Sequence, residues 1–136
     1  LDNRKLRVAA RRDLHESVIA TGTPWHGKSE ESHVTFAREV AAMTPATAGI
    51  RRNGSAALDL AWVAAGRFDG FWERNLQSWD IAAGIVLVRE AGGMISELDG
   101  GDVLQTGSIL AANVDLHPKL EKQIRHAGSF GKAASV

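Results

Sequence analysis

Residues 75–93 read NLQSWDIAAGIVLVREAGG, and this stretch decides the fold. Apolar residues recur in it at helical spacing, which predicts a helix from about Asp80 to Ala91 that ends at two glycines. The stripe consists of Ile81, Ile85 and Val88. Asp80 stands at the start of this helix, where a carboxylate loses hydration and needs a compensating partner to stay charged. The identity of that partner bears directly on function.

Strand and helix patterns alternate along the rest of the chain. Apolar, β-branched runs bounded by turn residues predict strands at Ser17–Thr21, 67–74, 94–98 and 107–113, and a short strand or turn at 48–54. Helical spacing predicts helices over about 30–43, from the N-cap Ser55 to Gly66, and along Leu116, Leu120 and Ile124. The alternation indicates an α/β fold in which helices cover a sheet, and the DGGD run at 99–102 is predicted to be a hairpin turn.

The length and charge of the chain exclude several functions. A chain of 136 residues has room for one hydrophobic core. Its 16 basic and 16 acidic residues leave no overall basic footprint for nucleic acid, so we expect no such partner. There is no cysteine and no apolar run of about 20 residues, so we expect a cytoplasmic protein with no membrane partner. The opening segment is nevertheless locally basic, through Arg4, Lys5, Arg7, Arg11 and Arg12.

Asp80 has polar company at the ends of two other predicted elements. Glu73 ends the preceding strand, and the NGSA run at 53–56 places small residues and free backbone N–H groups at a helix start. An N-capping role would also explain Asp80 by itself. If the three elements converge, they offer one acid for a hard cation, one acid for hydroxyl groups and amides for oxygen ligands. Magnesium suits this mixture, because it takes few protein carboxylates and keeps water or substrate oxygens.

A longer motif makes this interpretation more specific. The run GSAALDLAWVAAGRFDGFWERNLQSWDIAAGIVLVREAGG at 54–93 resembles the inositol monophosphatase family of the magnesium-dependent sugar-phosphatase superfamily. The family signature is a Trp-Asp pair, then Ala-Ala-Gly and a Glu-Ala-Gly-Gly close. The resemblance implies the C-terminal half of a layered αβαβα fold, with a mixed sheet of about five strands. It implies a domain over 1–126, followed by a flexible tail at 127–136.

The resemblance also implies roles for individual residues. Asp80 matches the metal-binding aspartate, which would hold Mg²⁺. Glu73 matches the acid that hydrogen-bonds substrate hydroxyls, and Gly54, Ser55 and Ala56 match the small-residue turn that lines the substrate pocket. The implied reaction is magnesium-dependent hydrolysis of inositol monophosphate or a similar polyol phosphate. The related branches that act on fructose bisphosphate, histidinol phosphate or phosphoadenosine phosphate stay open as alternatives.

One expected signature of the family is missing. An Asp-Pro-x-Asp-Gly-Thr turn supplies most of the metal ligands in the family, and no such run occurs in this sequence. We therefore expect the other ligands to lie in a missing N-terminal half, the intact parent to be a homodimer, and this chain alone to be inactive, with no catalytic residue beyond the metal ligand. A second reading is a non-catalytic partner in RNA or transcription complexes that binds through the basic opening segment.

The other polar residues have simpler interpretations. None of the five histidines has paired metal-ligand spacing, which predicts surface or loop positions for His15, His26, His33, His117 and His126. Asp59 is expected to face solvent from its helix. Trp79 is expected to pack beside Asp80.

Overall fold

The computed structural model describes residues 4–128, which form a five-stranded mixed sheet. The strands are β1 (Val18–Thr21), β2 (Gly49–Arg52), β3 (Gly70–Glu73), β4 (Met94–Glu97) and β5 (Ile109–Ala112). Their order in the sheet is β2-β1-β3-β5-β4. Strand β1 is parallel to β2 and β3, and β5 is antiparallel to β3 and β4. The carboxyl ends of β1, β2 and β3 therefore meet at one edge of the sheet.

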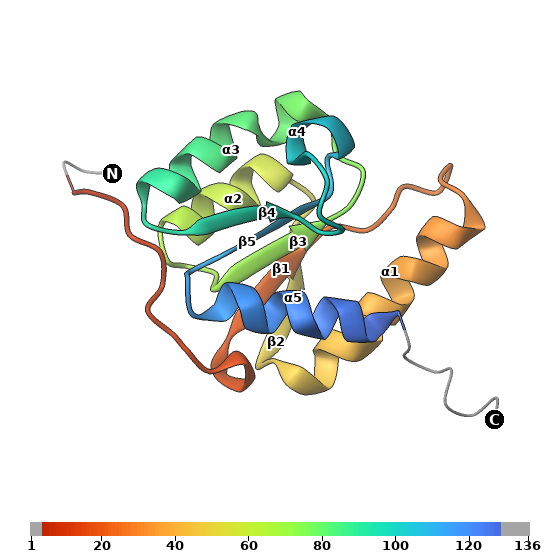
Figure 1. Ribbon diagram of the computed structural model, residues 1–136, viewed down its shortest axis with the longest axis horizontal. Helices are drawn as coiled ribbons and strands as arrows, with labels where there is room; N and C mark the ends of the chain where they lie inside the picture. Colours follow the sequence, from red (N-terminus) through yellow and green to blue (C-terminus); the bar gives the residue numbers. More distant parts are fainter. Residues whose placement is uncertain (1–3, 129–136) are drawn as a thin grey trace.

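Helices cover both faces of this sheet (Figure 1). Helices α2 (Ala56–Ala64) and α3 (Ser78–Glu90) pack together on one face, and α1 (Glu30–Met43) and α5 (Leu116–Ala127) pack together on the other. A single turn of helix, α4 (Val103–Thr106), lies between β4 and β5. Two 3₁₀ turns, Leu14–Glu16 and Thr44–Ala46, complete the described elements. The predicted α/β class and the order of strands and helices are confirmed.

Alternation along the strands builds two cores. On β3, Phe71 is buried with α2 and α3, whereas the next residue, Trp72, is buried in the cluster beneath α1 and α5. The same alternation places Ala111 in the first core and Leu110 in the second. Because successive side chains point to opposite faces, Glu73 shares the face of Phe71. The residue that follows, Arg74, emerges toward the face of Trp72.

Three local predictions need correction. Helix α3 begins at Ser78 and not at Asp80, so Asp80 occupies the third helical position. The predicted DGGD turn is present, but α4 follows it, started by the Asp102 side chain, which accepts a hydrogen bond from the Leu104 N–H (3.0 Å). Four residues are too few for a periodic signal. The predicted tail starts too early, because Ala127 is the buried last residue of α5; residues 129–136 lie outside the described part.

His117 is a second kind of error. It was expected at the surface or in a loop, but it is buried in α5, and its Nε2 lies 2.7 Å from the Ser96 hydroxyl. Burial lowers the pKa of this imidazole, partly offset by Glu121. A signal existed, because His117 shares the buried spacing of Leu120 and Ile124. His15 and His126 are exposed as expected, and no helix within residues 4–128 is long and apolar enough to cross a membrane.

Candidate functional site

A pocket of about 300 Å³ opens at the edge where β1, β2 and β3 end. Helices α2 and α3 begin at the same edge, so their free N–H groups lie beside it. All five residues that the sequence placed in the site line this pocket. The full lining consists of Gly22, Thr23, Arg52, Gly54, Ser55, Ala56, Ala57, Glu73, Leu76 and Asp80.

The turn before α2 forms one wall of the pocket. Gly54 has a φ of 86°, in the left-handed region that a side chain disfavours. Ser55 is the N-cap, and its hydroxyl accepts a hydrogen bond from the Leu58 N–H at 3.3 Å. Ala56 is the first residue of α2. The capping role predicted for Ser55 is therefore confirmed, and it keeps the hydroxyl engaged with the helix.

Glu73 forms the floor of the pocket, packed directly over Gly22. A Cβ atom placed on Gly22 would lie 2.0 Å from Glu73 Oε1, so the carboxylate can occupy this position only beside a glycine and would have to move if residue 22 carried a side chain. Burial is the main reason that the pKa of Glu73 is raised to about 7; the carboxylates of Asp59 and Asp80 contribute to this rise, and Arg52 opposes it. Near neutral pH this group is therefore present in both forms and can both accept and donate hydrogen bonds.

Asp80 is held at the N-terminus of α3. Its Oδ2 accepts a hydrogen bond from the Gln77 N–H at 3.2 Å, and the side chain is partly exposed to the pocket. The partner that the sequence left open is thus, within this chain, the start of its own helix. The neighbouring Trp79 is not part of the core, because its side chain is 77% exposed.

Asp59 does not line the pocket, but it is a buried acid whose charge acts on Glu73, and the sequence interpretation missed it. It was expected to face solvent, but it is fully buried on α2, where Asn53 Nδ2 donates to its Oδ1 at 3.1 Å. Its Oδ2 has no hydrogen-bond partner within residues 4–128. Burial raises the pKa of Asp59, and Asn53 and Arg52 offset part of this effect. No signal in the sequence marked this burial, because a single acid one turn after an N-cap is most often solvated.

The comparison with known families agrees with this geometry. The family model for the inositol monophosphatase family matches residues 1–129. The chain belongs to the inositol monophosphatase family. This is a family of phosphatases.

Proteins from several bacteria are similar in sequence to this family member. An inositol-1-monophosphatase of Caulobacter vibrioides is 53% identical over 126 residues, which is 91% of this chain and 48% of that protein. The Nus factor SuhB of Escherichia coli is 47% identical over 114 residues, which is 83% of this chain and 42% of that protein. The chain thus spans about half the length of the curated relatives it matches.

Solved structures show the same fold. The extragenic suppressor protein SuhB of Bartonella henselae superposes with a TM-score of 0.84 at 49% identity, over 90% of this chain and 47% of that one. The inositol monophosphatase of Thermotoga maritima gives a TM-score of 0.80 at 29% identity, over 94% of this chain and 48% of that one. The predicted mixed sheet with covering helices is therefore the fold of this inositol monophosphatase family member.

The pocket can supply part of a metal site but not all of its ligands. Within residues 4–128 there is no group of three or more His, Asp or Glu side chains placed to hold an ion. Asp80 lines the pocket, and one of its oxygens, Oδ2, already accepts a hydrogen bond from the Gln77 N–H. Magnesium is bound in proteins through one or two carboxylates, with waters and substrate oxygens completing its shell. Asp80 of this family member therefore suits one ligand position and not a whole site.

Proposed function

We propose that the intact parent of this chain hydrolyses a phosphate monoester of a polyol, such as inositol monophosphate, in a magnesium-dependent reaction. One observation carries the proposal: Glu73, Asp80 and the turn 54–56 come from three separate elements and line a single pocket. The names of the inositol-1-monophosphatase relatives support the choice of substrate. They do not exclude other phosphate esters of the superfamily.

Each pocket group has a role suited to its environment. Glu73 would hydrogen-bond substrate hydroxyls, for which a carboxyl with a pKa of about 7 is suited, because one oxygen can donate while the other accepts. The turn at 54–56 would line the sugar-like ring with small side chains and backbone amides. Asp80 would supply one ligand to Mg²⁺, which when bound polarises the phosphate and activates water.

The same geometry leads us to propose that this chain alone is inactive. A single carboxylate binds Mg²⁺ weakly, since the ion gives up its waters reluctantly. Further ligands would come from an N-terminal half, and the intact parent would work as a homodimer. Phosphate release by the homogeneous 136-residue chain that depends on Mg²⁺ would contradict this part of the proposal.

The decisive experiment compares substrates and one variant in the intact parent. We expect Mg²⁺-dependent release of phosphate from inositol 1-phosphate, faster than from fructose bisphosphate, histidinol phosphate or phosphoadenosine phosphate. Asp80→Asn should lower kcat by at least about 100-fold, since even changes to residues that only support a metal ligand cost up to about 100-fold. Asp115→Asn is the matched control, because Asp115 is exposed and pairs only at the surface with Arg12 (3.4 Å). Equal activity of the two variants would refute the metal role.

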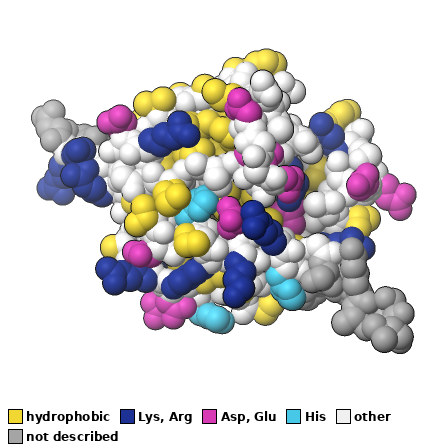
Figure 2. Space-filling view, in the orientation of Figure 1, with side chains coloured by type: hydrophobic (Ala, Val, Ile, Leu, Met, Phe, Trp, Pro, Cys, Tyr) yellow, Lys and Arg dark blue, Asp and Glu magenta, His cyan; other side chains and the backbone are white. Residues whose placement is uncertain are grey.

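A second candidate function follows from the relatives named Nus factor SuhB. Binding to RNA or a transcription complex would use the basic opening segment. Two of its charges are already paired within the chain, Arg11 with Asp69 (3.3 Å) and Arg12 with Asp115. On the face of the molecule drawn in Figure 2, basic side chains are interleaved with acidic ones and do not form one patch. This favours the phosphatase.

The two candidates differ in their response to salt. RNA binding through the opening segment should weaken steeply as salt increases, and neutralising its basic residues should abolish it. The variant would replace Arg4, Lys5, Arg7, Arg11 and Arg12 by glutamine. If RNA binding changes neither with salt concentration nor in this variant, the opening segment is not the contact.

A further inference from the structure

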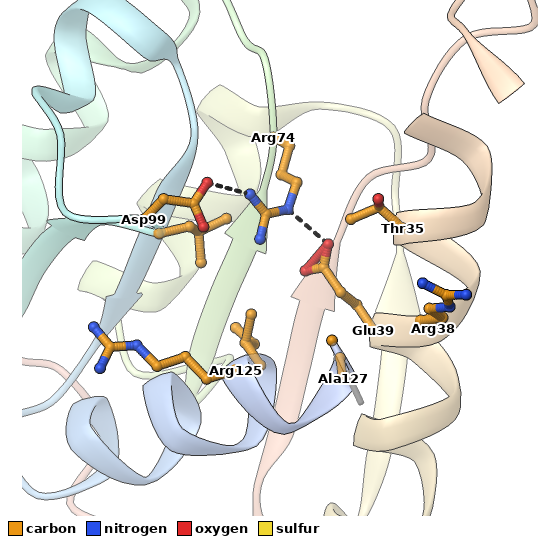
Figure 3. Close-up of a pocket in the computed structure, with 10 residues that line it drawn as sticks. Thr35, Arg38, Glu39, Arg74, Asp99, Arg125 and Ala127 are labelled. Carbon is orange, nitrogen blue, oxygen red and sulfur yellow. Dashed lines mark hydrogen bonds and ion pairs between the residues drawn. The ribbon is translucent and has the colours of Figure 1, made fainter. Parts of the chain in front are cut away.

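Arg74 joins three elements that are distant in sequence (Figure 3). Its Nε donates to Glu39 Oε1 of α1 at 2.7 Å, and its Nη1 donates to Asp99 Oδ2 of the turn after β4 at 2.8 Å. The three side chains line a hollow of about 290 Å³ on the α1 and α5 side of the sheet. Arg74 directly follows Glu73, which lines the candidate active site on the opposite side.

Glu39 restricts where the Arg74 guanidinium can lie. The Glu39 side chain is only 3% exposed, and its Oε2 has no hydrogen-bond partner within residues 4–128. Burial raises the pKa of Glu39, while the hydrogen bond and charge of Arg74 lower it. A buried carboxylate left without its cation is strongly destabilising, so Glu39 holds the Arg74 guanidinium in one place.

The other end of the contact is also fixed. Glu97 organises the turn that carries Asp99, since its carboxylate accepts from the N–H groups of Asp99 and Gly101 and from the Thr106 hydroxyl. Three hydrogen bonds to one carboxylate keep it ionised, and the pKa of Glu97 is lowered accordingly despite the opposing effect of its burial. Glu97 therefore fixes the backbone at Asp99, while the Asp99 side chain, which is 68% exposed, pairs with Arg74 at the surface.

The chain segment between Glu73 and α3 is fastened to the same region. Asn75 has a φ of 61° and donates its N–H to the Ser108 hydroxyl at 3.2 Å. The Leu76 N–H donates to the Gly107 carbonyl at 2.9 Å. With Arg74, these contacts define where β3 ends and where α3 starts.

We propose that Arg74 is a positioning residue that fixes the Glu73 carboxyl over Gly22 by tying the end of β3 to α1 and to the turn after β4. The inference rests on the proposed function, because it assigns to Arg74 the control of how tightly substrate hydroxyls are held. When the Arg74 contacts are lost, the end of β3 shifts and the Glu73 carboxyl moves away from Gly22. Asp80, the proposed metal ligand, is not altered by this change.

The test uses the intact parent and a variant that removes the ion pairs without leaving a buried charge. In Glu39→Leu combined with Arg74→Met, apolar side chains of similar volume replace the pair, which keeps the protein folded. We expect KM for inositol 1-phosphate to rise about tenfold, which corresponds to one lost hydrogen bond to a charged group, with kcat little changed. KM for p-nitrophenyl phosphate, which has no polyol hydroxyls, should stay the same. Arg38→Met is the control, because Arg38 lines the same hollow but points away from Arg74 (Figure 3).

A readout independent of catalysis separates the two proposals. The Glu73 carboxyl can be titrated by NMR, and its pKa should fall from about 7 toward 4.5 in the double variant as the group moves into solvent. If the wild type has no phosphatase activity but the pKa of Glu73 still falls in the double variant, the proposed function alone is refuted. An active wild type, with KM and the Glu73 titration both unchanged in the double variant, would overturn the role of Arg74.

Discussion

The replacement Glu73→Gln should make the protein more stable at neutral and higher pH. The pKa of Glu73 is raised from 4.5 to about 7 in the fold, first by burial and then by the charges of Asp59 and Asp80. Between these two values the folded state binds more protons than the unfolded state. The free energy of unfolding must then fall as pH rises through that window. Glutamine has no proton to lose and no charge to bury, so it does not pay this cost.

The size of the effect follows from the shift. One pKa unit corresponds to about 1.4 kcal/mol, so the full shift of Glu73 corresponds to about 3 kcal/mol. Much of this, about 2 kcal/mol, should develop between pH 5 and pH 8, because part of the window lies below pH 5. The wild type should therefore lose about 2 kcal/mol relative to Glu73→Gln over this range.

Urea denaturation at a series of pH values, with a chelator present, measures this difference directly. The quantity to plot is the free energy of unfolding of the variant minus that of the wild type, which cancels every other titrating group. Glu90→Gln is the matched control, because Glu90 is exposed on α3. Parallel curves for the wild type and Glu73→Gln from pH 5 to pH 8 would refute the assignment of a buried, repelled carboxyl.

Three further predictions concern other parts of the molecule. Gly22→Ala should raise KM for polyol phosphates, because its Cβ would displace the Glu73 carboxylate, which is the movable end of that side chain; Gly101→Ala, whose Cβ has only ordinary contacts, should leave KM unchanged. The pKa of His117 is lowered, so the wild type should lose stability relative to His117→Gln as pH falls below about 6.5. Equal changes in the melting temperatures of the two proteins on acidification would contradict this. The 136-residue chain should self-associate through exposed apolar residues such as Val86 on α3, which is 59% exposed; Val86→Glu should shift sedimentation toward monomer, and a monomeric wild type would count against it.

The sequence predicted the parts of this fold that repeat over many residues. The spacing of Ile81, Ile85 and Val88 was enough to predict α3, because burial of one helix face dominates its stability. The convergence of Glu73 and Asp80 was also accessible, since both follow elements that end at one edge of the sheet. The predicted roles of these residues in substrate and metal binding stay predictions.

The features that were missed depend on contacts with particular side-chain partners. Asp59 is buried because Asn53 reaches across a turn to it, and Arg74 is held by Glu39 and Asp99, which lie 35 and 25 residues away. Charged residues are most often solvated, so local pattern favours exposure for each of them. The burial of such groups is decided by tertiary partners that no local pattern names.

The charge of the pocket indicates which part of a substrate this chain recognises. Three carboxylates, Glu73, Asp80 and the buried Asp59, act on the site, and among the causes of the Glu73 shift only Arg52 opposes them. Such a pocket repels a phosphate dianion, so the phosphate needs a cation before it can lie near Asp80. Neutral hydroxyl groups meet no such penalty, and the raised pKa of Glu73 makes that carboxyl a better partner for them. We therefore expect this half of the fold to bind the polyol directly and the phosphate only through metal.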